Sequence, residues 1–137
     1  MSRASFILTF GIVALAACSS GSSPGGTTTG GTGGYTVTIS NYTFSPDPIV
    51  VPAGATITVK NEDATSAHTA TSEASAGSYA PGQASPNGFT FDTGNIDGGT
   101  MATISVPASV PSGTRQPYYC GLHQGMMNNP DPVIQVQ

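Results

Sequence analysis

The sequence has little positive charge. Of its 137 residues only three are Lys or Arg, against seven Asp or Glu, and the formal net charge is -4. A nucleic-acid-binding surface neutralises several phosphates with basic side chains, and anionic lipid headgroups attract clusters of the same residues. This chain lacks such clusters, so we expect neither a nucleic-acid partner nor charge-driven binding to lipid.

The sequence also lacks an apolar run long enough to span a bilayer. Its most apolar stretch, residues 6–15, follows Arg3 and is only about half the length of a membrane-spanning helix, which needs about 20 residues. These features predict a signal peptide over residues 1–17. The four residues Leu15-Ala16-Ala17-Cys18 resemble the bacterial lipobox, which implies acylation of Cys18; an ordinary cleaved signal beside a cysteine is the alternative.

A segment without apolar residues follows Cys18. Residues 19–34 are all Gly, Ser, Thr or Pro, a composition typical of a flexible tether. We therefore expect an acylated tether over 18–34 and one domain over 35–137, outside the cytoplasm, in the periplasm or at the cell surface. The lipid would be the only contact with the membrane.

Helical periodicity is absent from the remaining sequence, where apolar residues recur at every second position. Turn-forming clusters of Gly, Pro, Asn and Asp separate these stretches. Such a pattern predicts an all-β fold, a sandwich of two sheets with about seven short strands. We expect strands in these stretches: 35–40, 56–60, 89–91, 102–106 and 133–136. Residues 71–88, rich in Ala, Ser, Gly and Pro, are expected to form a long surface excursion.

Cysteine and histidine are scarce, and they are placed where one metal would need them. If Cys18 is acylated, Cys120 has no partner for an internal disulfide in an oxidising compartment. Cys120, His123 and Met126 lie close together on what must be a turn, because glycines interrupt any strand or helix there. The only other histidine, His68, follows a predicted strand and its polar turn.

Two imidazoles, one thiolate and a distant axial thioether form the ligand set of a type 1 copper site. Zinc is the competing metal, but structural zinc takes four strong ligands of the Cys and His kind, and this chain has three. Each residue alone could be structural, as a buried thiol, a hydrogen-bonded imidazole or a core thioether. Their combination favours a metal site.

The pattern resembles the cupredoxins, the small blue copper proteins that include plastocyanin and amicyanin. The matching parts are Cys120-x-x-His123-x-x-Met126 after an aromatic strand, the upstream His68, and the segment 42–63. The resemblance implies a Greek-key β-sandwich that binds one type 1 copper through His68, Cys120 and His123. Met126 would be the axial ligand, at a spacing similar to that of amicyanin, with Met127 as the alternative.

The groups that brace the ligand turn are left open by the resemblance. A hydrogen-bonding residue near the cysteine sulfur is needed to orient the ligands. The candidates are Asn61, Thr65, Ser66 and Thr69, of which we favour Asn61 and Thr69.

The resemblance implies a lipid-anchored electron carrier rather than an enzyme. His123 would be the surface port for electrons, within an apolar rim that includes Leu122, Met127 and Pro130. Both histidines are committed to one site, so no imidazole remains for a second copper centre. We expect a monomer whose partner is a redox protein such as a c-type cytochrome or an oxidase.

Two other functions remain open at this point. The same ligands would serve a periplasmic or surface protein that stores copper or delivers it to an oxidase. A metal-free adhesive or structural sandwich on a lipid tether is the third hypothesis.

Overall fold

The computed structural model describes residues 34–137. The predicted signal peptide (1–17), the acylation site Cys18 and all but the last residue of the tether lie outside the described residues, so these expectations stay predictions. Within residues 34–137 no helix is long and apolar enough to cross a membrane.

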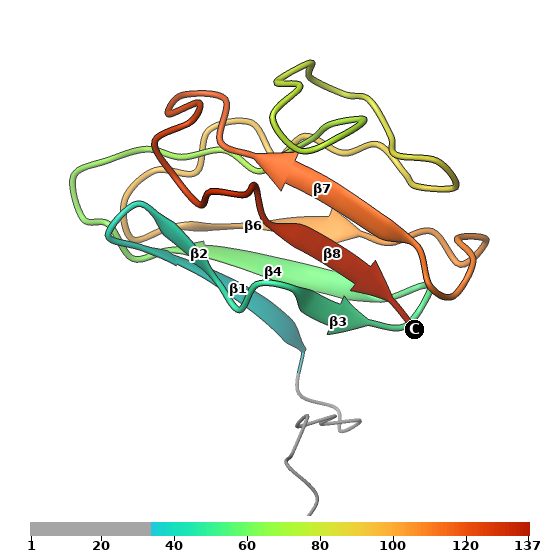
Figure 1. Ribbon diagram of the computed structural model, residues 1–137. Coiled ribbons are helices and arrows are strands. Elements are labelled where there is room, and N and C mark those ends of the chain that lie inside the picture. The colour runs from blue at the N-terminus through green and yellow to red at the C-terminus, as the bar shows by residue number, and fades with distance from the viewer. Residues whose placement is uncertain (1–33) are drawn as a thin grey trace, which may run out of the picture.

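Two four-stranded sheets form the fold (Figure 1). In spatial order, the first sheet contains β2 (Thr43–Ser45), β1 (Tyr35–Ser40), β4 (Thr56–Asn61) and β6 (Met101–Ser105). The second contains β3 (Ile49–Val51), β8 (Val133–Val136), β7 (Arg115–Tyr119) and β5 (Thr71–Ser72). β1 pairs with β4, and β3 with β8, in parallel; the other pairs are antiparallel. The predicted all-β, two-sheet sandwich is confirmed.

The alternating pattern places one face of each sheet in the core. In β4, Ile57 and Val59 are fully buried, whereas Lys60 is exposed. The second sheet contributes Ile134 and Val136 from β8 to the same apolar cluster. Burial of each such side chain is worth about 1.5–3 kcal/mol, which makes this contact the main reason why the two sheets stay together.

The strand expected at residues 89–91 does not form. The backbone N–H of Phe89 donates to Gln116 Oε1 (3.1 Å), and that of Phe91 donates to Ser72 Oγ (2.9 Å). Because side-chain oxygens accept these hydrogen bonds, both amides are satisfied without a continuous ladder. The two phenyl rings pack 5.5 Å apart against the core.

Residues 71–88 are only in part the surface excursion that we expected. Thr71 and Ser72 form the buried strand β5 against β7, and Glu73 is buried as well. Beyond Glu73 most residues are exposed or half-buried.

Two connections determine the position of the candidate site. Residues 62–70 follow β4 of the first sheet, and residues 120–127 follow β7 of the second. Both lie at the same end of the sandwich, beside the β1–β2 turn (Figure 1).

Candidate metal centre

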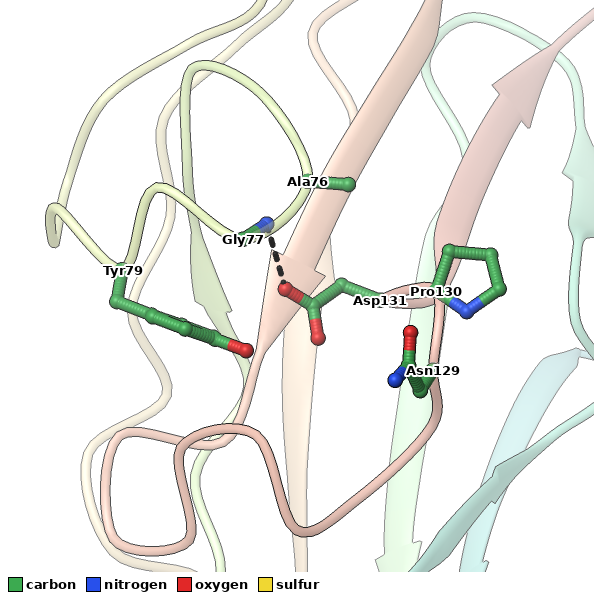
Figure 2. Close-up of a pocket in the computed structure, with 6 residues that line it drawn as sticks. All are labelled: Ala76, Gly77, Tyr79, Asn129, Pro130 and Asp131. Carbon is green, nitrogen blue, oxygen red and sulfur yellow. Dashed lines mark hydrogen bonds between the residues drawn. The ribbon is translucent and has the colours of Figure 1, made fainter.

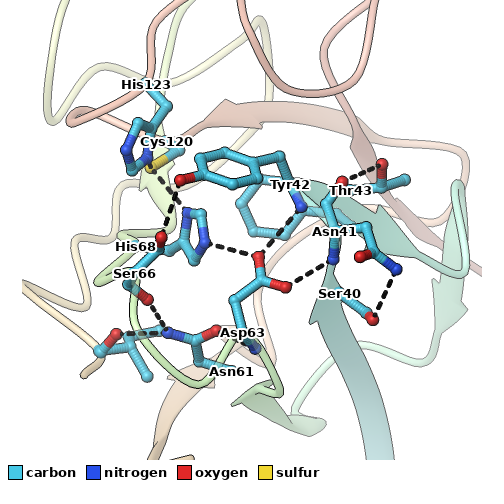
Figure 3. Close-up of polar contacts among 12 residues, drawn as sticks. Ser40, Asn41, Tyr42, Thr43, Asn61, Asp63, Ser66, His68, Cys120 and His123 are labelled. Atoms are coloured by element: carbon cyan, nitrogen blue, oxygen red, sulfur yellow. Dashed lines mark hydrogen bonds and ion pairs between the residues drawn. The ribbon is translucent and has the colours of Figure 1, made fainter. Parts of the chain in front are cut away.

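The fold brings together the three strong ligands that the sequence predicts. Cys120 Sγ lies 3.7 Å from His68 Nδ1 and 3.6 Å from His123 Nδ1 (Figure 3). All three ligand atoms lie within 4.8 Å of one another. A metal with bonds of about 2.0 to 2.3 Å to nitrogen and sulfur keeps neighbouring ligand atoms roughly 3.5 to 3.8 Å apart. The donor set therefore fits a single type 1 copper site.

His68 is held through its backbone. It exchanges two hydrogen bonds with Ile96, from His68 N to Ile96 O (3.1 Å) and from Ile96 N to His68 O (2.7 Å). Asn61 Nδ2 donates to the carbonyls of Ser66 (2.7 Å) and Ile96 (2.9 Å), while Asn61 Oδ1 accepts from Asp63 N (3.0 Å). The Asn61 side chain therefore fixes the turn that leads to His68, whose side chain is fully buried.

Thr69 connects the two ligand segments. Its backbone N–H donates to Cys120 Sγ (3.3 Å), and its Oγ1 accepts a hydrogen bond from Gly121 N (2.7 Å). The same Oγ1 lies 3.2 Å from Thr71 Oγ1. Thr69 thus gives the sulfur a donor from outside the ligand set and also fixes the start of the ligand turn.

The turn after Cys120 folds the His123 ring back over the sulfur. His123 N donates to Cys120 O (3.2 Å), and Met126 N donates to His123 O (3.0 Å), which makes two successive tight turns. His123 is only partly buried, in contrast to His68 and Cys120. One ligand ring therefore reaches the surface.

The two methionines differ in burial. Met126 is 72% exposed, whereas Met127 is 7% exposed and packs in the core cluster. The next residue, Asn128, fixes the chain beside Met127 through the backbone of Phe44. Its Oδ1 accepts from Phe44 N (2.7 Å), and its Nδ2 donates to Phe44 O (3.1 Å). Met126, the axial ligand that the spacing suggested, is thus the exposed methionine of the turn, and the alternative Met127 is the buried one.

Two residues near the ligands had no assigned role in the sequence analysis. Asp63 accepts hydrogen bonds from Asn41 N (2.6 Å), Tyr42 N (3.0 Å) and His68 Nε2 (2.9 Å). These bonds hold the pKa of Asp63 below its ordinary value despite partial desolvation, and the bond from Tyr42 N has the largest effect. A carboxylate in the polar turn just before His68 was a usable signal, because ligand imidazoles commonly donate their other ring N–H to such a group. No feature of the sequence indicated that Tyr42 lies near the ligands.

A small pocket of about 120 Å³ lies beside the segment that leaves the ligand turn (Figure 2). Its lining residues are Ala76, Gly77, Tyr79, Asn129, Pro130 and Asp131. Gly77 N donates to both Asp131 Oδ2 (2.9 Å) and Glu73 Oε1 (3.3 Å). Burial, and then the hydrogen bond to Glu73, raise the pKa of Asp131 to about 6. None of these residues is one of the predicted ligands.

Comparison with known proteins gives structural matches only. No family model matches the sequence, and no curated protein is significantly similar to it. Several solved structures are similar to the chain. A Cu-containing nitrite reductase from Thermus scotoductus SA-01 matches over 76% of this chain, with 21% identity and a TM-score of 0.57; the match spans only 22% of the nitrite reductase chain.

Two further structures are matched over most of their length. A purple cupredoxin from Nitrosopumilus maritimus is similar over 75% of this chain and 99% of its own, at 19% identity and a TM-score of 0.53. A mutant of amicyanin in its reduced Cu(I) form is similar over 77% of this chain and 83% of its own, at 13% identity and a TM-score of 0.53. The chain therefore has the cupredoxin fold.

Proposed function

We propose that this chain is a type 1 copper protein that carries single electrons between redox partners outside the cytoplasm. The observation that supports this most strongly is the convergence of His68 Nδ1, Cys120 Sγ and His123 Nδ1 at one buried point. Copper held there supplies one-electron chemistry between Cu(I) and Cu(II), because thiolate and imidazole ligands suit both states.

The ligands are held by bonds that do not depend on the metal. His68 is paired with Ile96, and Thr69 bonds both Cys120 Sγ and Gly121 N. A ligand set fixed in this way changes little between oxidation states, which suits rapid electron exchange.

The surface around His123 suits brief contact with another protein. The ring is partly exposed, and Leu122 and Met126 beside it are 51% and 72% exposed. Electron-transfer complexes use small, transient interfaces of this kind. The proposed partner is a c-type cytochrome or an oxidase, with the carrier acting as a monomer.

Burial leads us to propose Met127 rather than Met126 as the axial ligand. A weak axial thioether has to approach the metal from within the protein, and Met127 is the methionine of the turn that packs in the core. Met126 then belongs to the contact surface around His123.

We propose a carrier rather than an enzyme, although one similar structure is a nitrite reductase. The chain has two histidines, and both lie in the cluster with Cys120, so it has no imidazole for a second copper centre. Residues 1–18 support attachment to a membrane by acylated Cys18, in the periplasm or at the cell surface.

The test uses the full chain, purified in detergent and loaded with Cu(II). An intense visible copper–thiolate absorption is expected, and it should be lost in Cys120→Ser and weakened or lost in His68→Ala. Met101→Leu, a change at an exposed residue of β6, should leave it unchanged. A colourless parent protein would contradict the proposal.

A second measurement separates electron transfer from copper delivery. The loaded protein should exchange electrons rapidly with a c-type cytochrome and keep its metal when mixed with a metal-free acceptor. Complete transfer of copper within minutes, with negligible electron exchange, would instead identify a storage or delivery protein.

A further inference from the structure

Asp63 contacts the one buried imidazole of the site on the side away from the sulfur. Its Oδ2 lies 2.9 Å from His68 Nε2, while His68 Nδ1 faces Cys120 Sγ at 3.7 Å (Figure 3). The Asp63 carboxylate can only accept a hydrogen bond, so Nε2 carries the proton and Nδ1 is free to bind a metal.

The carboxylate also fixes an unusual turn. Asn41 and Tyr42 both have positive φ, 50° and 59°, a conformation that is uncommon outside glycine. Asp63 accepts hydrogen bonds from both of their backbone N–H groups, at 2.6 and 3.0 Å. One side chain therefore determines both the orientation of His68 and the course of this turn.

This turn places an aromatic ring against both ligand imidazoles. The Tyr42 ring lies edge-on to His68 (centroids 5.2 Å apart, 86° between planes) and to His123 (4.9 Å, 80°). Its hydroxyl lies 2.7 Å from Ser66 Oγ. Tyr42 thus covers the two rings, and its position depends on Asp63.

The negative charge of Asp63 has no fixed cation to neutralise it among the ion pairs of the described residues. Lys60 bonds Glu62 at 2.8 Å, and the Asp63 pair is with His68 alone. The other groups that donate to its oxygens are neutral amides. An uncompensated charge of this sign favours the more positive state of a nearby metal.

We propose that Asp63 is a positioning residue that orients His68 through Nε2 and lowers the reduction potential of the bound copper. The inference rests on the proposed copper site. The charge would stabilise Cu(II) relative to Cu(I). The ratio of the protein's affinity for Cu(II) to its affinity for Cu(I), and not only the retention of the metal, should therefore depend on this side chain.

The test compares the midpoint potential of the copper-loaded full chain with that of its Asp63→Asn variant. Redox titration gives each potential, with the visible copper–thiolate band as the signal. Asparagine keeps an acceptor oxygen for Nε2–H and removes the charge. We expect the preference for Cu(I) over Cu(II) to rise about tenfold, which corresponds to about 59 mV for one electron. Glu62→Gln is the matched control, because it removes an adjacent, exposed charge that pairs with Lys60 and not with His68; its ratio should change less than twofold.

Equal potentials in Asp63→Asn and Glu62→Gln would overturn the redox role. A second measurement needs neither metal nor variant. In the metal-free parent at about pH 8, nitrogen NMR should show His68 protonated at Nε2 and not at Nδ1; the opposite tautomer would overturn the orienting role, even if Asp63→Asn fails to fold. A parent protein with the expected tautomer but no copper–thiolate band would contradict the proposed function alone.

Discussion

At the scale of single residues, Thr69 shows how the backbone and side chain of one neutral residue can hold a metal site together. It belongs to the segment after β4 yet bonds the sulfur and the first amide of the turn after β7. The ligand His68 and the ligand Cys120 are therefore linked through protein atoms as well as through a metal. Loss of this link should be measurable without copper.

Thr69→Val keeps the shape of the side chain but removes Oγ1. Gly121 N–H then loses its partner, and because this hydrogen bond is only partly buried the loss costs about 0.5–1.5 kcal/mol. We expect a loss of that size in the free energy of unfolding of the metal-free protein, measured by denaturant titration. The exposed Thr65 provides the control: Thr65→Val should change the free energy by less than about 0.5 kcal/mol.

The two methionines of the ligand turn allow a direct comparison. The axial ligand tunes the potential of a type 1 site, so Met127→Leu should shift the midpoint potential and the visible spectrum. Met126→Leu, at a 72% exposed position, should leave both unchanged. The reverse result, a shift in Met126→Leu alone, would restore the assignment suggested by the sequence spacing.

At the scale of elements, the segment after β5 supports the ligand turn from the side. The Tyr79 ring packs against Tyr119, with centroids 5.3 Å apart, and a Cβ added at Gly125 would lie 3.3 Å from its hydroxyl. The backbone of this segment is fixed by Glu73, whose Oε2 accepts from Tyr79 N (2.9 Å). The buried Glu73 and Asp131 side chains therefore hold the backbone of the segment that contacts the ligand turn.

The raised pKa of Asp131, about 6, gives this element a pH dependence. The folded state holds the proton more tightly than the unfolded chain, whose pKa is near 3.8. The stabilisation is therefore complete below about pH 4 and is lost as the pH rises through 6. We expect the free energy of unfolding to fall by about 1 to 3 kcal/mol over this range because of Asp131, since one pKa unit corresponds to about 1.4 kcal/mol.

Asp131→Asn should remove most of this decline, because asparagine is neutral at every pH and can still accept from Gly77 N–H. The exposed Asp97 supplies the control, and Asp97→Asn should keep the decline of the parent. Denaturant titrations at pH 4 and pH 7 would measure both. An equal decline in parent and Asp131→Asn would exclude the carboxyl pair as its source.

The elements that the sequence predicts well are those whose partners are other strands. Alternation predicts β1, β4, β6 and β8 because one face of each lies in the core. The segment 89–91 has the same alternation, but its amides are satisfied by Gln116 and Ser72, which come from distant positions and leave no local pattern. In β7 four consecutive residues are buried, so alternation could not reveal it.

The residues of the candidate site also divide into those that the sequence predicts and those that it does not. Cys120 and His123 are recognisable because one turn carries them, and His68 because it is the only other histidine. The contact of Tyr42 with both imidazoles depends on the folded path of the β1–β2 turn, and the choice between Met126 and Met127 depends on burial. Neither the path of this turn nor the burial of the two methionines can be read from the spacing of residues along the chain.

At the scale of the whole molecule, the candidate centre joins the two layers of the sandwich. His68 follows β4 of the first sheet, whereas Cys120 and His123 follow β7 of the second. A metal held by all three adds a link between sheets that otherwise depend mainly on apolar contact. Binding to the folded state alone stabilises it by mass action, by about 2.7 kcal/mol at a free metal concentration 100 times the Kd.

Copper loading should therefore raise the Tm of the parent, and a chelator should reverse the increase. In His68→Ala the two ligands of the second sheet remain, so weak metal binding can persist without a link to the first sheet. We expect its Tm to rise by less than half as much as that of the parent at the same metal concentration, measured by circular dichroism because the chain has no Trp. Met101→Leu, at an exposed position of the first sheet, should show the full increase. An increase in His68→Ala equal to that of the parent would mean that the metal is held within the second sheet alone, and that the end of the sandwich is closed by side-chain packing.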